Sequence, residues 1–262
     1  MAAGGSLARR VVRRIRRGLR PPPVPPPPPA PAAQAVPELR WTYDSDGLKT
    51  IHNCDFLEDP LFREAYRLGS ETGSWYGFDI RWRAYVVCWA AEKGRTVEGD
   101  YVECGVNRGG YSRAAMHYID FANLPEKRFY LVDTYCGIPE EFMEEENRAL
   151  LEGRYGDCYE EVVRTFAPFA NAVVVRGTIP DVLPEVGAER VCYLSIDMNC
   201  AAPEIAAAEF FWDKLSSGAV VVLDDYGFSQ FIRQKHAFDA FARARGVSVL
   251  SLPTGHGLIV KP

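Results

Sequence analysis

The segment 101–112 reads YVECGVNRGGYS, and this stretch predicts the fold of the chain. A short apolar strand runs into Glu103, and a glycine-containing turn then leads to a helix that starts near Tyr111. A ligand can approach the main chain closely only where no Cβ intervenes, and glycine also adopts positive φ at little cost. The free N–H groups at a helix start add polar contacts. The turn contains Gly105, Gly109 and Gly110.

Further along the chain, apolar runs alternate with helical segments. This alternation is typical of a doubly wound parallel sheet, in which binding groups gather at the carboxyl ends of the strands. We therefore expect an α/β, Rossmann-like, doubly wound, mostly parallel seven-stranded sheet with an antiparallel C-terminal hairpin at 247–261. The other strands are expected at 101–102, 127–132, 172–175, 191–196 and 218–223. Acids end four of these strands: Glu103, Asp133, Asp197, and the pair Asp224 and Asp225.

Composition excludes several classes of protein. A chain of 262 residues has room for one large α/β domain, and no apolar run approaches the ~20 residues of a membrane span. Residues 1–20 carry seven arginines and no acid, so the rest has 23 basic and 35 acidic side chains. An acidic body argues against nucleic-acid binding. The seven scattered cysteines lack CxxC spacing and indicate reduced thiols in a cytoplasmic protein.

The chain divides into three parts on composition. Residues 1–37 form a basic, proline-rich tail, with ten of the nineteen prolines between 21 and 37, and we expect it to be disordered. Its first 20 residues could instead contact an anionic membrane or an acidic partner. No apolar region of a secretory signal is present there. Residues 38–96 form a helical and irregular cap region, and 97–262 form the core.

Local signals predict several boundaries. Asp79 is a candidate N-cap for a helix that ends by Gly94, Asp157 begins another helix, and Pro203 opens a third at a favourable first-turn position. Within the irregular region, His52, Asn53, Asp55, Trp75 and Tyr76 could line a site, and the sequence does not rank them. The long acidic segment 134–156 is either a cover over a site or a solvated charged face.

The acid beside the glycine turn constrains the ligand. A dinucleotide needs a place for its pyrophosphate, and Glu103 would repel a phosphate. A carboxylate attracts a cationic amine, such as that of the methionine part of S-adenosylmethionine. Asp133 lies about twenty residues beyond the glycines at the end of the next strand, where it can accept both hydroxyls of a ribose. These residues favour a nucleoside ligand that carries an amine.

Three further acids supply hard oxygen donors. Asp224 and Asp225 are adjacent, and Asp197 ends a neighbouring strand. Three carboxylates with open positions favour Mg²⁺ over zinc. The ion would bind a substrate hydroxyl, lower its pKa and fix it in line with a methyl group. The alternative is three solvent-exposed loop ends, although packing like charges together without a cation costs repulsion.

Four segments resemble the macrocin O-methyltransferase (TylF-type) family, which belongs to the class I S-adenosylmethionine-dependent methyltransferases. They are VECGVNRGG, VDTYCGIP, SIDMN and GAVVVLDDYGF, and the likeness covers roughly residues 70–262. It implies a Mg²⁺-dependent enzyme that methylates sugar hydroxyls, with the cofactor S-adenosylmethionine. In the family an Asp-Gly-Asp triplet follows the fourth strand, whereas this chain has Asp197, Met198 and Asn199. The acceptor and the task of the second carboxylate are therefore open.

The resemblance and the residues together give a set of expected site residues. Asp197, Asp225 and the loop residue His256 are candidates for catalysis, and Asp197, Asp224 and Asp225 are candidates for the metal. We expect a small hydroxylated acceptor, no nucleic acid and a homo-oligomer. A scaffold protein that has lost catalysis is the second interpretation, and an enzyme for NAD or a nucleotide sugar is the third. The expected cofactor contacts are Glu103, Gly105, Asn107, Gly109, Gly110, Tyr111, Ser112, Asp133, Thr134, Gly177 and Asp197.

Overall fold

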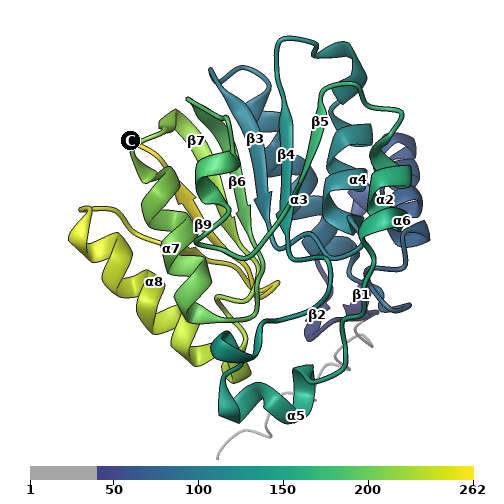
Figure 1. Ribbon diagram of the computed structural model, residues 1–262. Helices are drawn as coiled ribbons and strands as arrows, with labels where there is room; N and C mark the ends of the chain where they lie inside the picture. Colours follow the sequence, from purple (N-terminus) through teal and green to yellow (C-terminus); the bar gives the residue numbers. More distant parts are fainter. Residues whose placement is uncertain (1–39) are drawn as a thin grey trace, which may run out of the picture. The chain divides into compact units, whose positions relative to one another are not determined.

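A seven-stranded sheet lies between two layers of helices in the computed structural model, which describes residues 40–262 (Figure 1). The tail predicted at residues 1–37 lies outside the described residues. The strand order is β5-β4-β3-β6-β7-β9-β8, and only β9 runs antiparallel to the other strands, pairing in this way with both β7 and β8. The expected α/β fold, including its terminal hairpin, is confirmed. The strands are β3 (Asp100–Cys104), β4 (Phe129–Asp133), β5 (Ala172–Arg176), β6 (Val191–Ile196), β7 (Leu215–Leu223), β8 (Leu250–Ser251) and β9 (Gly257–Val260).

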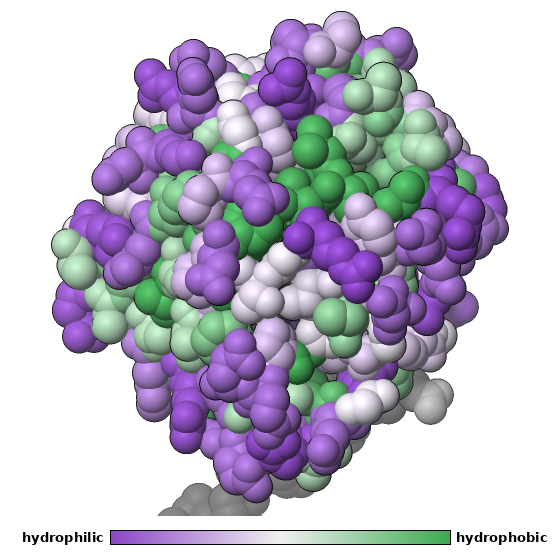
Figure 2. All heavy atoms as spheres, in the orientation of Figure 1, coloured by the Kyte–Doolittle hydropathy of each residue, from purple (hydrophilic) through white to green (hydrophobic). Residues whose placement is uncertain are grey.

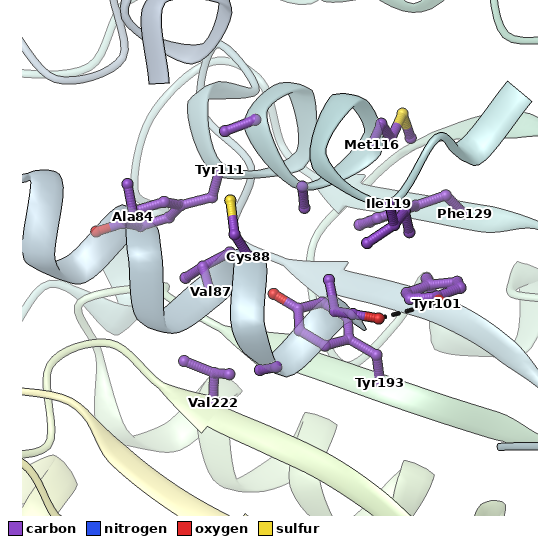
Figure 3. Packing of buried hydrophobic residues seen from close by; sticks show 14 of the residues in the cluster. Ala84, Val87, Cys88, Tyr101, Tyr111, Met116, Ile119, Phe129, Tyr193 and Val222 are labelled. Carbon is purple, nitrogen blue, oxygen red and sulfur yellow. Dashed lines mark hydrogen bonds between the residues drawn. The ribbon is translucent and has the colours of Figure 1, made fainter. Parts of the chain in front are cut away.

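Alternate residues of the central strands enter different cores. Tyr101 faces the core formed with α2 (Pro60–Glu71), α3 (Arg81–Gly94), α4 (Gly110–Tyr118) and α6 (Tyr159–Phe166), while Val102 faces the core formed with α7 (Ala201–Trp212) and α8 (Ile232–Ala244). Figure 3 shows the first core, in which the Tyr101 hydroxyl donates to the carbonyl of Ala91 at 3.1 Å. Both faces of the parallel strands are thereby covered, which explains their continuous apolar sequences.

The strand order reverses between β3 and β6, and this point determines where the site lies. From β3 the chain proceeds outward through β4 and β5, and it then returns to β6 on the other side of β3. Loops at the carboxyl ends of such neighbours diverge and leave a crevice. The short helix α5 (Arg148–Leu151) and the hairpin of β1 (Tyr43–Ser45) and β2 (Leu48–Thr50) lie beyond this end of the sheet (Figure 1).

Several local boundaries differ from the sequence prediction. Helix α3 follows Ile80, and Asp79 does not cap it at the expected position, although its carboxylate accepts the N–H of Arg81 at 3.2 Å. Helix α6 begins two residues after Asp157, and α7 begins at Ala201 instead of Pro203. The hairpin β1–β2 was not predicted, because its three-residue strands carry little apolar pattern. Within residues 40–262, no helix has the length and apolarity of a bilayer span.

Candidate active site

A cavity of about 350 Å³ lies at the carboxyl ends of the parallel strands. Most of the expected site residues line it, from five different strand ends or the turns that follow them. Gly109, Ser112 and His256 do not line it. The structure therefore gathers the predicted acids around one space instead of spreading them over separate surfaces. The expected residues that line the cavity are Glu103, Gly105, Asn107, Gly110, Tyr111, Asp133, Thr134, Gly177, Asp197, Asp224 and Asp225.

The glycine turn brings the ends of β3 and β6 into close contact. Gly105 has a φ of 88°, and a Cβ at this position would lie 1.8 Å from the carbonyl oxygen of Asp197. No other residue type fits both the conformation and the space. The turn thus fixes Asp197 relative to Glu103, which lies one residue before the end of β3.

Asp133 stabilises the same turn through hydrogen bonds to backbone N–H groups. Its Oδ2 accepts the backbone N–H groups of Val106 and Asn107 at 2.6 and 2.8 Å, and its Oδ1 accepts the N–H of Tyr135 at 2.6 Å. Oδ2 thereby uses both of its lone pairs, whereas Oδ1 keeps one, so Asp133 could still accept one ribose hydroxyl from the cavity. Hydrogen bonds from the protein alone therefore stabilise the negative charge of this carboxylate.

Glu103 is buried and has fewer partners. The Ser112 hydroxyl donates to its Oε2, so Ser112 holds this carboxyl group from behind the cavity wall. Burial raises the pKa of Glu103 well above its usual value, and the nearby Asp197 and Asp133 raise it further. A cationic group in the cavity would relieve both effects. This environment fits the ammonium of a methionine-like ligand and does not fit a pyrophosphate.

The three aspartates form a compact cluster at the other end of the cavity. One ligand oxygen from each of Asp197, Asp224 and Asp225 lies within 4.8 Å of the others. Oδ2 of Asp225 is buried and has no hydrogen-bond partner among the described residues. Burial raises the pKa of Asp225, and Asp224 raises it further; burial, Asp224 and Asp225 do the same for Asp197. This donor set fits a hard divalent cation.

Asp224 differs from its two neighbours because the protein already pairs it. Arg83 Nη1 donates to its Oδ2 at 3.0 Å, and His256 Nε2 donates to its Oδ1 at 2.7 Å. Burial alone would raise the pKa of Asp224, but Arg83 and His256 outweigh it and lower the pKa to about 2. Arg83 also holds Asp46 through two hydrogen bonds of 2.7 and 3.2 Å. His256 itself is fully buried behind Asp224.

Two segments outside the sheet complete the cavity. The segment predicted as a cover or as a solvated charged face has both properties: Phe142 and Leu151 line the cavity, while Glu140, Glu141 and Glu145 are exposed. The rim has an apolar part, because three exposed side chains line it: Tyr76, Phe78 and Leu150. On the face drawn in Figure 2, hydrophobic side chains gather across the middle, bordered by hydrophilic ones.

Sequence reasoning missed Arg83 and Asp46, and it could not rank Trp75 and Tyr76. Arg83 lies on a helix whose aromatic neighbours dominate the pattern, and its partner Asp224 follows 141 residues later. Of the five unranked groups, Trp75 and Tyr76 line the cavity, whereas His52, Asn53 and Asp55 do not. No spacing in the sequence distinguishes these two sets.

Comparisons with solved structures agree with the fold. The O-methyltransferase NovP has a TM-score of 0.60 and 21% identity over 68% of this chain and 79% of that chain. The calicheamicin methyltransferase CalS11 has a TM-score of 0.56 and 16% identity over 80% and 94% of the two chains. Cofactor-bound Rv0187 from MTB has a TM-score of 0.53 and 13% identity over 78% and 90%. At these identities the likeness shows the fold alone.

Comparison with protein families is more specific. No curated protein matches the sequence. The family described as Macrocin-O-methyltransferase (TylF) matches residues 81–250, which include the glycine turn and all three aspartates of the cluster. The match spans well over half of the 262 residues, and the chain belongs to this family of O-methyltransferases.

Proposed function

We propose that this protein transfers a methyl group from S-adenosylmethionine to a hydroxyl of a sugar or another small natural product, with the help of Mg²⁺. One observation carries the proposal: a single cavity joins the buried carboxyl of Glu103 beside the glycine turn to the cluster of Asp197, Asp224 and Asp225. Family membership supports the reaction type and the methyl donor. A similar structure with a TM-score of 0.51 is described as a TDP-rhamnose 3'-O-methyltransferase, which supports a sugar as acceptor.

The donor supplies an electrophilic methyl group on a sulfonium, and the chain positions that group. Glu103 would hold the ammonium of the methionine part, and Oδ1 of Asp133 would accept a ribose hydroxyl while Oδ2 fixes the turn. A Cβ on Gly105 or Gly110 would clash with Asp197 or Trp75, so these glycines allow the segments of the cavity wall to pack closely together. Holding two reactants in a near-attack geometry is worth several orders of magnitude in rate.

The aspartate cluster prepares the acceptor hydroxyl. A bound Mg²⁺ would lower the pKa of that hydroxyl. Asp224 is held in one orientation by Arg83 and His256, so His256 acts as a positioning residue. The Asn199 side chain, 3.5 Å from Asp197, is an amide and is not a base. We therefore assign acceptance of the proton to Asp225, whose Oδ2 has no other partner among the described residues.

Calorimetry with S-adenosylhomocysteine tests the donor site. We expect binding in the micromolar range, and no binding at high micromolar concentration would contradict the proposal. A parallel titration with NAD should give no heat. A screen of hydroxylated metabolites with labelled methyl donor then identifies the acceptor. Cofactor binding without methyl transfer to any acceptor would favour the scaffold interpretation.

The metal is tested separately from the donor site. Asp224→Ala should abolish turnover, leave the affinity for S-adenosylhomocysteine unchanged and remove binding of Mn²⁺ as a Mg²⁺ substitute. Asp213→Ala, an exposed acid, serves as the control. Unchanged turnover in excess chelator would remove the ion from the mechanism and leave the methyltransferase proposal in place.

A further inference from the structure

Two members of the aspartate cluster are held in place by different means. The carboxylate of Asp224 is held directly by the side chains of Arg83 and His256. Among the described residues, the only side chain that donates to the carboxylate of Asp197 is Asn199, whose Nδ2 lies 3.5 Å from Oδ1, at the limit of a hydrogen bond. The position of Asp197 in the cluster therefore depends on its backbone.

Three contacts hold the backbone around Asp197. Its N–H donates to the carbonyl of Cys104 at 2.9 Å, and its own carbonyl oxygen lies so close to Gly105 that a Cβ there would be 1.8 Å away. The next N–H in the chain, that of Met198, donates to Oε1 of Glu204 at 3.1 Å. The first two contacts come from β3 and the turn after it. Glu204 lies in the first turn of α7, so the third contact ties the peptide group after Asp197 to this helix.

The position of Glu204 is unusual for an acid. The residue is 2% exposed, and within residues 40–262 no basic side chain forms an ion pair with it. Most of its neighbours in the helix sequence AAPEIAAAEFFW are apolar. Burying a carboxyl group costs free energy unless hydrogen bonds offset the loss of water. The hydrogen bond from Met198 provides such an offset, and it lies beside the aspartate cluster.

We propose that Glu204 is a positioning residue for the divalent cation: it holds the N–H of Met198 and thereby keeps Asp197 in the orientation that completes the aspartate cluster. The inference rests on the metal part of the proposed function and extends it to a residue that does not line the cavity. It assigns the effect to the reach of the Glu204 side chain and not to its charge. Partners that orient a metal ligand from behind contribute about 10- to 100-fold to metal affinity.

Two variants separate reach from charge. Glu204→Gln removes the charge and keeps an acceptor oxygen with the same reach, whereas Glu204→Asp keeps the charge and shortens the side chain by one methylene. We expect Glu204→Asp to raise the Kd of Mn²⁺ about tenfold or more, and Glu204→Gln to stay within about threefold of the wild type. The Kd of S-adenosylhomocysteine should change less than about twofold in both variants. Calorimetry measures both ligands.

Glu144→Asp is the matched control. Glu144 also accepts an N–H at the start of α7, that of Ala201 at 3.1 Å, but Ala201 is not a neighbour in the chain of any aspartate of the cluster. Shortening this acid should leave the Kd of Mn²⁺ within about twofold of the wild type. A loss as large as that of Glu204→Asp would mean that any loosening of the helix start disturbs the metal site, and it would overturn the inference.

The wild type supplies a test that needs no variant. Coupling between two sites is reciprocal, so a hydrogen bond that favours the cation must itself be strengthened by the cation. Saturating Mg²⁺ should therefore slow hydrogen exchange of the Met198 amide at least about threefold more than that of the Ala201 amide. Equal slowing of the two amides, or none, would contradict the inference even if Glu204→Asp does not fold.

The remaining outcomes are distinguishable. A loss of Mn²⁺ affinity in Glu204→Gln that equals or exceeds that in Glu204→Asp would assign the effect to charge, and an unchanged affinity in Glu204→Asp would leave Glu204 without a role at the site. Either result overturns the inference. A wild type that binds S-adenosylhomocysteine but not Mn²⁺ would remove the cation, and this inference with it, while the methyl-donor part of the proposed function would stand.

Discussion

Asp133 ends the buried strand β4 and Asp225 lies just after β7, and both line the cavity, yet the protein provides them with different hydrogen-bond partners. Asp133 accepts three backbone N–H groups at 2.6 to 2.8 Å. Asp225 has a buried oxygen with no partner in the described part of the chain, and its pKa is raised by burial and by Asp224. The first carboxylate shapes the backbone around a ligand. The second carboxylate has no hydrogen-bond donor for its Oδ2 among the described residues, and a bound cation would neutralise its charge. The two ends of the cavity are therefore suited to different ligands.

The largest expected effect is that of Asp225→Asn, which removes the carboxylate at the end of the cavity that we assign to the metal. The neutral amide is a poorer ligand for Mg²⁺ and is not a base, while no hydrogen bond within the described protein is lost from Oδ2. We expect kcat/KM to fall about 10³-fold, or about 4 kcal/mol, with little change in S-adenosylhomocysteine affinity. Steady-state kinetics and Mn²⁺ titration measure this, with Asp213→Asn as control. Full activity with intact Mn²⁺ binding would show that Asp225 is only structural.

Gly105→Ala disturbs the close contact between the turn after β3 and Asp197 at the end of β6. The new Cβ would lie 1.8 Å from the Asp197 carbonyl oxygen and would also strain a φ of 88°. We expect the free energy of unfolding to fall by about 3 kcal/mol or more. Gly47→Ala separates the two causes, because Gly47 has a φ of 75° with nothing within 4 Å, and strain alone costs about 1–2 kcal/mol. Equal losses in urea unfolding would mean that the close contact contributes nothing.

Asp133→Asn makes the same chemical change as Asp225→Asn, but at the end of the cavity that we assign to the cofactor. An amide N–H₂ in place of one carboxylate oxygen would face backbone N–H groups and lose their charge-assisted bonds. We expect about 2 kcal/mol less stability and roughly tenfold weaker S-adenosylhomocysteine binding, because the turn loosens. Mn²⁺ affinity should stay within about twofold. If Mn²⁺ binding weakened as much as cofactor binding, the cofactor end and the metal end of the cavity would be coupled.

The sequence predicted the sheet and its acidic rim, because both depend on local pattern. Apolar runs bounded by helices identify parallel strands, and an acid directly after such a run must lie at the carboxyl edge. Asp133, Asp197 and Asp224 followed from this reasoning. The difference between Asp224 and Asp225 did not, because it depends on Arg83 and His256, which come from other parts of the chain.

The cap region was the hardest part to predict for the same reason. Trp75 and His52 have equally irregular surroundings in the sequence, and only tertiary packing on Tyr66 and Tyr111 places the first at the cavity. The short strands β1 and β2 position Asp46 beside Arg83, a contact across 37 residues. Contacts of this kind carry no periodicity, so a single sequence does not reveal them.

The smallest expected effect is on the pH dependence of stability. Burial and neighbouring acids raise the pKa values of Asp197 and Asp225 above their usual value near 4. From about pH 4 upward, and through the raised pKa values, the folded state therefore binds more protons than the unfolded state, and stability falls as pH rises. Asp224, whose pKa is lowered to about 2, makes stability rise with pH, but this gain is complete by about pH 4 and does not affect the range above it.

The metal-free protein should therefore unfold at a higher temperature at pH 5.5 than at pH 7.5, by a few degrees for an effect of about 1 kcal/mol. Asp225→Asn should flatten this dependence in part, since it removes one of the acids with a raised pKa, while others such as Glu103 and Glu204 remain. Mg²⁺ should stabilise the wild type more at pH 7.5 than at pH 5.5, because protons compete with the ion for the same oxygens. A melting temperature that changes equally with pH in the wild type and in Asp225→Asn would mean that the aspartate cluster is not the source. The charge repulsion at this end of the cavity would then be relieved by the protein itself, as it is at Asp133.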